Sequence, residues 1–213
     1  MSKLISPAIS DYLESLVPPR HPELARMERD AAETDFPIIG PAAGQFCYLL
    51  ARMIGATRVF ELGSGFGYST AWFARAVREN GGGIVHHVVW DEDLSRRARE
   101  HLAVLELIDL VTFTIGEAVA ALNRTEGPFD LIFNDIEKRG YPDALPVIAE
   151  KLRPGGVLVI DNMFWDGQIF DDADHSPDTN GVRRFTQMVT ASPEWEVTLV
   201  PIRDGLIVAR KRG

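Results

Sequence analysis

From Arg58 onward the chain alternates short apolar runs with segments of helical periodicity. The apolar runs have the length of strands, and they read RVFEL, IVHHVVW, LVTFTI, FDLIFND and GVLVID. Such alternation is typical of βαβ units, in which parallel strands share one sheet and helices cover both of its faces. This pattern constrains the fold more than any other feature, and it predicts an α/β core over residues 58–213.

Both ends of the chain depart from this alternation. Residues 1–57 show helical periodicity over 7–16, 21–35 and 41–55, with proline-containing breaks between these stretches. Near the other end, EWEVTLVP and GLIVARK are strand-like runs joined by IRDG, and strands joined so tightly must be antiparallel. We therefore expect a mostly parallel seven-stranded sheet closed by a C-terminal hairpin. Residues 1–57 form a helical cap on the same single domain.

Charge and composition argue against several kinds of partner. The net charge of −9 and the lack of a basic run argue against nucleic acid as the main partner. No apolar run has the length or setting of an export signal or a membrane span. The only cysteine, Cys47, lies in a helical pattern and forms no internal disulfide. We expect a cytoplasmic protein that does not associate with membranes, with Cys47 buried.

A glycine-rich turn follows the first predicted strand. The stretch ELGSGFG begins with Glu61 and carries glycines at 63, 65 and 67. Glycines allow a tight turn and a close approach of a ligand to the backbone. A dinucleotide fingerprint would instead read G-x-G-x-x-G, and a carboxylate beside it would repel a pyrophosphate. The turn therefore favours a nucleoside that carries positive charge, and a purely structural turn is the alternative.

A second acid, Asp91, ends the next predicted strand in VVWDED. A carboxylate at that position can accept hydrogen bonds from both hydroxyls of a ribose. Glu61 and Asp91 together indicate S-adenosylmethionine as the ligand, and a nicotinamide dehydrogenase fits less well. The stretch FELGSGFG resembles the first motif of the class I S-adenosylmethionine-dependent methyltransferases.

Polar oxygens end the fourth and fifth predicted strands. Asp135 ends FDLIFND, and Asp161 with Asn162 ends GVLVIDN. Because parallel neighbours end at the same edge of a sheet, we expect these side chains to converge. An all-oxygen set suits a hard cation, Mg²⁺ first, with Ca²⁺ or Mn²⁺ as alternatives. Taken singly, each residue also has a structural explanation as a turn or a helix cap.

Lys138 follows Asp135 by three residues, so a short turn would bring both into one cleft. A partly buried lysine beside a divalent cation is disfavoured in its charged form, which makes it a candidate general base. A solvated surface lysine is the alternative.

These motifs resemble those of the cation-dependent O-methyltransferases, the family of catechol and caffeoyl-CoA O-methyltransferases. The family pattern F-x-D-x-[DE]-K-x-x-Y is matched over Phe133–Tyr141, and GG-x-x-x-x-DN-x-x-W-x-G over Gly155–Gly167. The closing P-x-x-DG-x-x-x-A falls at Pro201–Ala209. The resemblance runs from about Pro37 to the C-terminus.

The resemblance implies a Rossmann-like methyltransferase fold and methyl transfer to a catechol-like or vicinal-hydroxyl small molecule. It also implies a homodimer formed through the N-terminal helices. Lys138 would be the general base, and Tyr141 and Trp165 would face the acceptor. The metal would be held by Asp135, Asp161 and Asn162. The cofactor pocket would be lined by Glu61, Gly63, Ser64, Gly67, Ser69, Asp91, Ala118 and Asp135.

Some residues depart from the family pattern. His86 and His87 face opposite sides of the second predicted strand, and we interpret both as structural rather than as ligands. Trp90 packs either on the cofactor or in the core, and Asn134 stands where an apolar residue is common. The acidic stretch 170–181 indicates a mobile loop that shapes the acceptor pocket together with the N-terminal helices.

Two other functions compete with this interpretation. One is methylation of a hydroxylated uridine in tRNA, against which the net charge of −9 counts. The other is a non-catalytic S-adenosylmethionine-binding protein that keeps the fold. The presence of Lys138 together with all the metal-ligand candidates argues against that second alternative.

Overall fold

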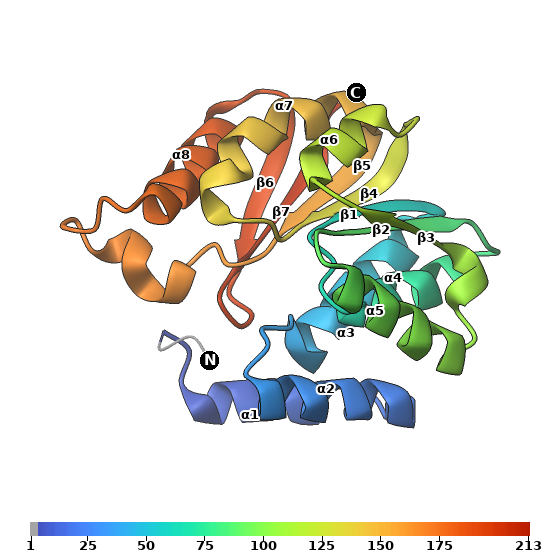
Figure 1. Cartoon of the computed structure of the whole chain (residues 1–213). Helices are drawn as coiled ribbons and strands as arrows, with labels where there is room; N and C mark the ends of the chain where they lie inside the picture. Colours follow the sequence, from blue (N-terminus) through green and yellow to red (C-terminus); the bar gives the residue numbers. More distant parts are fainter. Residues whose placement is uncertain (1–3) are drawn as a thin grey trace.

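The structure is a computed structural model that describes residues 4–213, and a single seven-stranded sheet runs through it (Figure 1). The strand order is β3-β2-β1-β4-β5-β7-β6. All the predicted strands are present, and β5 begins ahead of the predicted apolar run. The strands are β1 (Arg58–Leu62), β2 (Ile84–Val89), β3 (Val111–Ile115), β4 (Phe129–Asn134), β5 (Leu152–Ile160), β6 (Trp195–Val200) and β7 (Leu206–Lys211).

The sheet changes direction only at its C-terminal end. Strands β1 to β5 pair in parallel, and β7 pairs antiparallel with both β5 and β6. This confirms the predicted parallel sheet and its C-terminal hairpin. Since β1 lies between β2 and β4, the order of the strands reverses there, and in open α/β sheets ligands bind beyond the strand ends at such a point.

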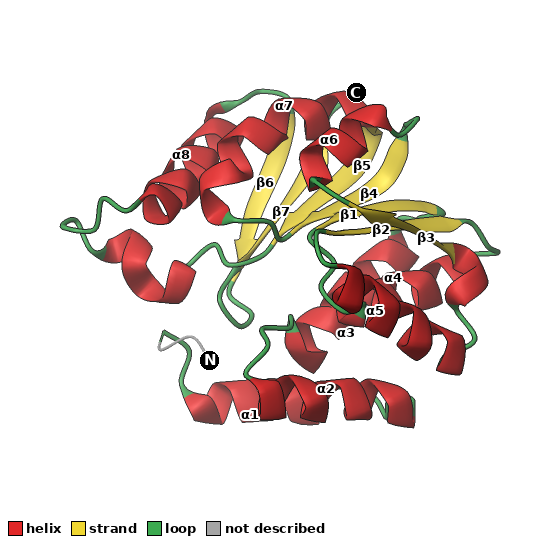
Figure 2. Ribbon diagram, viewed as in Figure 1, coloured by secondary structure: helices red, strands yellow, loops and turns green. Residues whose placement is uncertain are grey.

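Helices cover both faces of the sheet, as expected (Figure 2). Successive strand residues point to opposite faces, so β4 sends Phe133 into one core and Ile132 into the other. The core that contains Phe133 is covered by α3 (Gly40–Met53), α4 (Tyr68–Glu79) and α5 (Glu92–Val104). The core that contains Ile132 is covered by α6 (Ala118–Arg124), α7 (Tyr141–Lys151) and α8 (Pro177–Ala191).

Two further helices, α1 (Pro7–Ser15) and α2 (Pro22–Thr34), lie along one side of the molecule next to α3 (Figure 1). Helix α2 buries Met27, and its Glu23 carboxylate lies 2.7 Å from the Nδ1 atom of His101 on α5. Helix α1 buries no residue and exposes Tyr12. The association of two copies through these helices stays a prediction. Residues 1–3 of the predicted segment 1–57 lie outside the described residues.

Helix starts follow from capping residues in the sequence. Ser6 and Ser176 accept hydrogen bonds from backbone N–H groups in the first turns of α1 and α8, and proline follows each of them. Helix α8 therefore begins at Pro177, inside the stretch 170–181 that the sequence predicted as a loop.

Short 3₁₀ turns occur at η1 (Ile108–Leu110), η2 (Lys138–Gly140) and η3 (Trp165–Phe170). None of the helices within residues 4–213 combines the length and apolar character that a membrane span needs.

The contact between α3 and α4 joins the N-terminal segment to the core at Gly44. A Cβ atom added at Gly44 would lie 2.3 Å from Nε1 of Trp72, which is itself buried. Glycine is therefore needed here for space, because only a residue without a side chain lets the two helices approach this closely.

We predict that Gly44→Ala lowers the free energy of unfolding by about 1–2 kcal/mol. Overpacking costs roughly 1–3 kcal/mol, and a contact of 2.3 Å with a buried ring places the cost in the upper part of that range, about 2–3 kcal/mol. The better helix propensity of alanine offsets about 1 kcal/mol of it. Urea denaturation measures the change, and Gln45→Ala on the next, half-buried position is the control. Equal stability of Gly44→Ala and wild type would show that the helices can separate without cost.

Candidate active site

A cavity of about 1040 Å³ lies at the carboxyl edge of the sheet, on the side of α1 and α2. Its other walls are formed by residues 35–43 before and at the start of α3, by the loops after β1, β4 and β5, and by the turn between β6 and β7. Ligand pockets in proteins usually have volumes of about 300–1,000 Å³, so this cavity has room for a cofactor and an acceptor together.

The predicted site residues divide into two groups. One group lines the cavity: Gly63, Ser64, Ser69, Asp135, Lys138, Asn162 and Trp165. The other group does not line it: Glu61, Gly67, Asp91, Ala118, Asp161 and Tyr141.

The glycine-rich turn after β1 rests directly on the end of β4. Gly63 has φ +83°, and a Cβ atom there would lie 2.4 Å from the carbonyl oxygen of Asp135. The backbone N–H of Asp135 donates to the carbonyl of Leu62 over 2.9 Å. The backbone of the predicted cofactor motif therefore packs directly on the backbone of the predicted metal motif at Asp135. This contact fixes the position of the two motifs relative to each other.

Two other residues of this turn have structural partners. Gly67 starts α4 with φ +91°, and a Cβ atom there would lie 2.9 Å from Cβ of Ala98, so the glycine lets α4 and α5 meet. The Ser64 hydroxyl accepts a hydrogen bond from the backbone N–H of Val88 over 3.0 Å, which ties the turn to β2. Both residues hold the shape of the turn.

Among the described residues, Glu61 is a fully buried carboxylate whose oxygens lack well-formed hydrogen bonds. Its exposed fraction is 0%, and neither oxygen has a hydrogen bond of normal geometry within residues 4–213. Burial raises the pKa of Glu61 to about 7, although the nearby hydroxyls of Ser69 and Thr70 favour its charged form. Because an unpaired buried carboxylate is unfavourable, a ligand that brings positive charge or hydrogen-bond donors would stabilise it.

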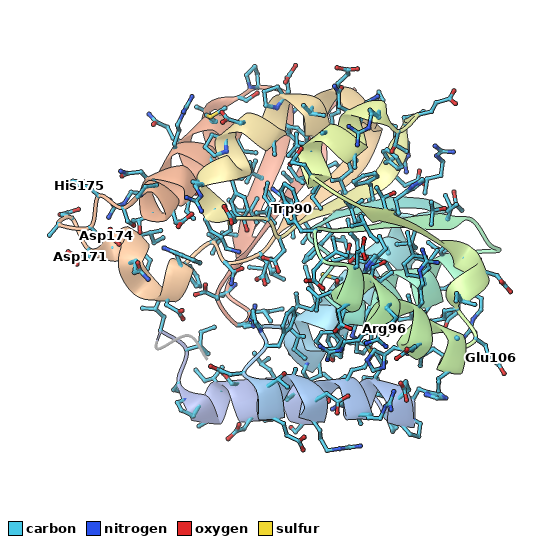
Figure 3. The ribbon with its side chains drawn as sticks, viewed as in Figure 1. Trp90, Arg96, Glu106, Asp171, Asp174 and His175 are labelled. Carbon is cyan, nitrogen blue, oxygen red and sulfur yellow. The ribbon has the colours of Figure 1, made fainter. Side chains whose placement is uncertain are left out.

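Asp91, Trp90 and Ala118 lie at the ends of β2 and β3. The Asp91 carboxylate accepts a hydrogen bond from the backbone N–H of Leu94 over 2.9 Å and caps α5. Trp90 is 69% exposed (Figure 3), so packing in the core is excluded. Ala118 is the first residue of α6 and is buried. Contact of Asp91 and Ala118 with a nucleoside stays a prediction.

The adjacent histidines of β2 pack against aromatic rings, His86 on Phe60 and His87 on Phe113. The ring of His86 stacks on Phe60 with 5.5 Å between the ring centroids. His87 is fully buried, its Nδ1 atom lies 3.0 Å from the hydroxyl of Thr70, and burial lowers its pKa to about 3. Both positions agree with the structural interpretation.

The ends of β4 and β5 bring the oxygen donors together. Asp161 has an exposed fraction of 0%, and its Oδ1 atom accepts from the backbone N–H of Asn162 over 2.8 Å. Its Oδ2 atom accepts from Nη1 of Arg203 over 2.6 Å. Burial raises the pKa of the Asp161 carboxyl, Arg203 opposes that shift, and the nearby Asp135 carboxylate adds to it. The buried Tyr141 hydroxyl donates to the Asp161 carbonyl over 3.0 Å, so it supports this strand end.

The donor set fits a hard cation. Two carboxylates and the Asn162 amide provide oxygen donors only, and the Asn162 amide nitrogen is turned to Asp204 at 3.3 Å. The part of the chain that the structure describes contains no group of three or more His, Cys, Asp or Glu side chains arranged for a metal. The candidate site has only two carboxylates, because its third donor is the amide of Asn162. One of these carboxylates, Asp161, is paired with Arg203.

Lys138 lies next to these donors and is largely enclosed. Its Nζ atom donates to Oδ1 of Asp135 over 2.9 Å and to the carbonyl of Ile136 over 3.2 Å. The rings of Tyr141 and Trp165 lie 5.5 and 5.6 Å from Nζ. With a side-chain exposure of 12%, Lys138 is not a solvated surface lysine. One ammonium N–H is left for a group in the cavity.

The sequence did not indicate several residues that shape this site. Arg203 and Asp204 come from the turn between β6 and β7, and the Asp-Gly turn signal located that turn but not its contact with Asp161. Gly181 of α8 faces the Lys138 loop, where a Cβ atom would lie 2.3 Å from the carbonyl oxygen of Lys138. No local pattern marks that glycine, because the contact depends on how α8 packs.

The acidic stretch before α8 is bonded to the rest of the chain. Asp171, Asp174 and His175 lie at the outer edge of the molecule (Figure 3). The Arg183 guanidinium donates to the carbonyls of Asp171 and Asp174, each over 2.6 Å. Of residues 170–181, only Asp178 lines the cavity. This stretch therefore contributes little to the cavity wall.

Comparison with known proteins gives a consistent result. A family model described as O-methyltransferase matches residues 16–212. The chain is similar to a catechol O-methyltransferase of Niastella koreensis, with 31% identity over 220 residues that cover 98% of this chain and 99% of that protein. It is also similar to caffeoyl-CoA O-methyltransferase 2 of Populus trichocarpa, with 29% identity that covers 99% and 91% of the two chains.

A solved structure shows the same likeness. The chain matches an O-methyltransferase from Bacillus cereus in complex with SAH at 29% identity and a TM-score of 0.86, covering 96% of this chain and 97% of that one. The family resemblance and the Rossmann-like methyltransferase fold predicted from the motifs are confirmed.

The raised pKa of Glu61 predicts a loss of stability as the pH rises. The folded protein keeps a proton on Glu61 up to a pH of about 7, whereas the unfolded chain releases it near its ordinary value of 4.5. The folded state therefore binds more protons between these two values, and Glu61 contributes a fall in stability of roughly 3 kcal/mol there. The raised pKa of Asp161 adds to this fall and the lowered pKa of His87 opposes it. Urea denaturation of ligand-free wild type and Glu61→Gln at pH 5 and pH 8 therefore isolates the contribution of Glu61.

Between pH 5 and pH 8, the change in stability of Glu61→Gln should be roughly 3 kcal/mol more favourable than that of wild type. The exposed Glu33 supplies the control, and Glu33→Gln should behave like wild type. An unchanged loss of stability in Glu61→Gln would assign the effect to another group.

Proposed function

The chain belongs to the O-methyltransferase family, and on that premise we propose that it methylates a catechol-like or vicinal-hydroxyl small molecule with S-adenosylmethionine and a divalent cation. The family model spans residues 16–212, so the enzyme class extends over nearly the whole chain. One observation carries the finer proposal. Asp135, Asn162 and Lys138 line one wall of the cavity, and Asp161 lies directly behind that wall.

The cofactor would lie along the turn after β1. Gly63 and Ser69 line the cavity there, and the buried Glu61 lies close to Ser69. When bound, S-adenosylmethionine supplies a methyl group on a positively charged sulfur, and the Glu61 carboxylate favours that charge. The relative from Bacillus cereus was solved in complex with SAH, which supports a cofactor of this kind.

Asp135, Asp161 and Asn162 would hold the divalent cation, with Mg²⁺ preferred over Ca²⁺ or Mn²⁺. When bound, such a cation would supply Lewis-acid chemistry that lowers the pKa of the acceptor hydroxyl. Burial and the 3.0 Å bond from Tyr141 hold the end of β5 in place, so the two carboxylates keep a fixed spacing. Fixed donors favour one orientation of the acceptor.

In its neutral form, with its two N–H groups bonded to Asp135 and the Ile136 carbonyl, Lys138 would take up the proton of the acceptor hydroxyl on its lone pair. Asp135 and the Ile136 carbonyl orient its Nζ atom, and the Trp165 ring shields it from solvent. A general base needs to lie within hydrogen-bond reach of the proton that it accepts, and Lys138 lines the cavity where an acceptor would lie.

The acceptor class follows from the donors and the relatives. A cation held by three oxygen donors is well suited to chelation by two adjacent hydroxyls, and Trp165 offers an aromatic surface in the same cavity. The relatives named above are a catechol O-methyltransferase and a caffeoyl-CoA O-methyltransferase. We therefore propose an aromatic vicinal diol.

Methyl transfer to a panel of catechols tests this proposal. Activity should require Mg²⁺, disappear with EDTA, and fall about 100-fold or more in Asp161→Ala. The exposed Asp143 on α7 supplies the control, and Asp143→Asn should keep full activity. Methyl transfer that continues in EDTA would contradict the role of the cation, whereas absence of transfer to every catechol would contradict the acceptor class.

A second prediction concerns the position of Lys138. An alanine side chain at Gly181 has no room against the carbonyl of Lys138 at 2.3 Å, so the backbone of the loop must shift. We predict that Gly181→Ala lowers kcat roughly 10- to 100-fold, because small displacements of a reacting group are costly. The affinity for S-adenosylmethionine, measured by calorimetry, should stay within twofold of wild type, since the close contacts of a Cβ atom at Gly181 are with Lys138 and Arg139 and not with the β1 turn.

Gln187 is exposed on the same helix, and Gln187→Ala is the control for general effects on α8. If Gly181→Ala keeps the wild-type kcat, the loop position does not limit the reaction.

A further inference from the structure

The turn between β6 and β7 places a positive charge on the buried carboxylate of the candidate metal site. Arg203 lies in this turn, and its Nη1 atom lies 2.6 Å from Oδ2 of Asp161. The Asp161 side chain is 0% exposed, and the Arg203 side chain is 29% exposed. This ion pair joins residues 42 positions apart, so it is a contact of the fold and not of the local sequence.

The turn that carries Arg203 is fixed by its neighbours. The Asp204 carboxylate accepts from the backbone N–H of Asp166 over 2.9 Å, and the Asp204 carbonyl accepts from the N–H of Phe164 over 2.7 Å. At Gly205 a Cβ atom would lie 2.9 Å from the Phe164 ring, so the turn lies flat against the loop after β5.

Arg203 itself has a backbone conformation that arginine rarely adopts. Its φ is +53°, in the left-handed region where residues other than glycine, asparagine and aspartate are disfavoured. Strained residues of this kind persist where the surrounding structure holds them, and they cluster at functional sites. Here the side chain is held by Asp161, which is a candidate metal ligand.

Both oxygens of the Asp161 carboxylate already have partners. Oδ1 accepts from the backbone N–H of Asn162, and Oδ2 accepts from Arg203. A divalent cation that takes Oδ2 as a ligand would stand within a few ångströms of the guanidinium, and two positive charges so close together repel strongly in a buried site. The guanidinium and the cation therefore cannot share this oxygen.

We propose that the guanidinium of Arg203 competes with the divalent cation for the Asp161 carboxylate, so that only one of the two binds Asp161 at a time. The proposal rests on the cation of the proposed function. When the cation binds, the guanidinium moves off Asp161 into the cavity, which Arg203 already lines. The ion pair satisfies the buried carboxylate in the absence of metal and lowers the affinity for metal, so the cation is exchangeable.

Binding of Mn²⁺, measured by electron paramagnetic resonance of the free ion, tests the proposal without reference to activity. The variants are Arg203→Gly and Arg203→Asn, because glycine and asparagine both tolerate the backbone of this position. Each should bind Mn²⁺ about 10- to 100-fold more tightly than wild type, the effect of losing one charge-assisted hydrogen bond that competes with the metal.

Arg139 is the matched control. It lines the same cavity but pairs with the Glu137 carboxylate, 2.6 Å away, rather than with Asp161. Arg139→Gln removes one positive charge from the same cavity without freeing Asp161. The affinity of this variant for Mn²⁺ should differ less than about threefold from wild type, because the charge of Arg139 reaches the metal only through solvent-screened electrostatics. A thermal shift with S-adenosylmethionine checks that each variant is folded.

Several results would overturn the proposal. These are equal or weaker Mn²⁺ binding by both Arg203 variants, an equal gain in Arg139→Gln, or no binding by any protein. If wild type binds no Mn²⁺ but both Arg203 variants do, Arg203 does occupy the site as proposed. That result would instead contradict the cation dependence of the natural enzyme.

Discussion

Parallel pairing of β1, β4 and β5 is the constraint on which the site depends. Leu62 lies opposite Asn134, and Asn134 lies opposite Ile160, so the three strands end level with one another. The next residues continue the ladder, because the N–H of Asp161 donates to the carbonyl of Asn134 over 3.2 Å. The hydrogen bonds of the backbone therefore set the spacing of the two carboxylates. A shift of one residue in β4 or β5 would turn a donor away from the cavity.

Most of the fold could be predicted because its signals are local. Apolar runs such as FDLIFND mark buried strands, and the Asp204-Gly205 turn marks the hairpin. The prediction of a loop over 170–181 was wrong at its end, because Ser176 caps α8 and Pro177 starts it. An acidic, proline-containing stretch looks the same in a loop and in a capped helix start, and only the following periodicity separates them.

The site was predictable only in part, for a physical reason. Asp135, Asn162 and Lys138 follow strand ends, so topology alone brings them to one edge of the sheet. Arg203 and Gly181 act through tertiary contacts, namely the ion pair with Asp161 and the close approach of α8 to the Lys138 loop. Asp91 illustrates a different limit of sequence analysis, because one local pattern can have two explanations. An aspartate after a strand can bind the hydroxyls of a ribose, and it can also cap the following helix, as Asp91 does here.

The most direct test of this account is a crystal structure with Mn²⁺ and S-adenosylhomocysteine, in which anomalous diffraction locates the metal. The account predicts one strong peak within coordination distance of oxygens from Asp135, Asp161 and Asn162, at about 2.0–2.3 Å. In that structure the Arg203 guanidinium has left Asp161. A peak elsewhere, or no peak while Arg203 still contacts Asp161, would contradict the central claim that these three side chains form a metal site.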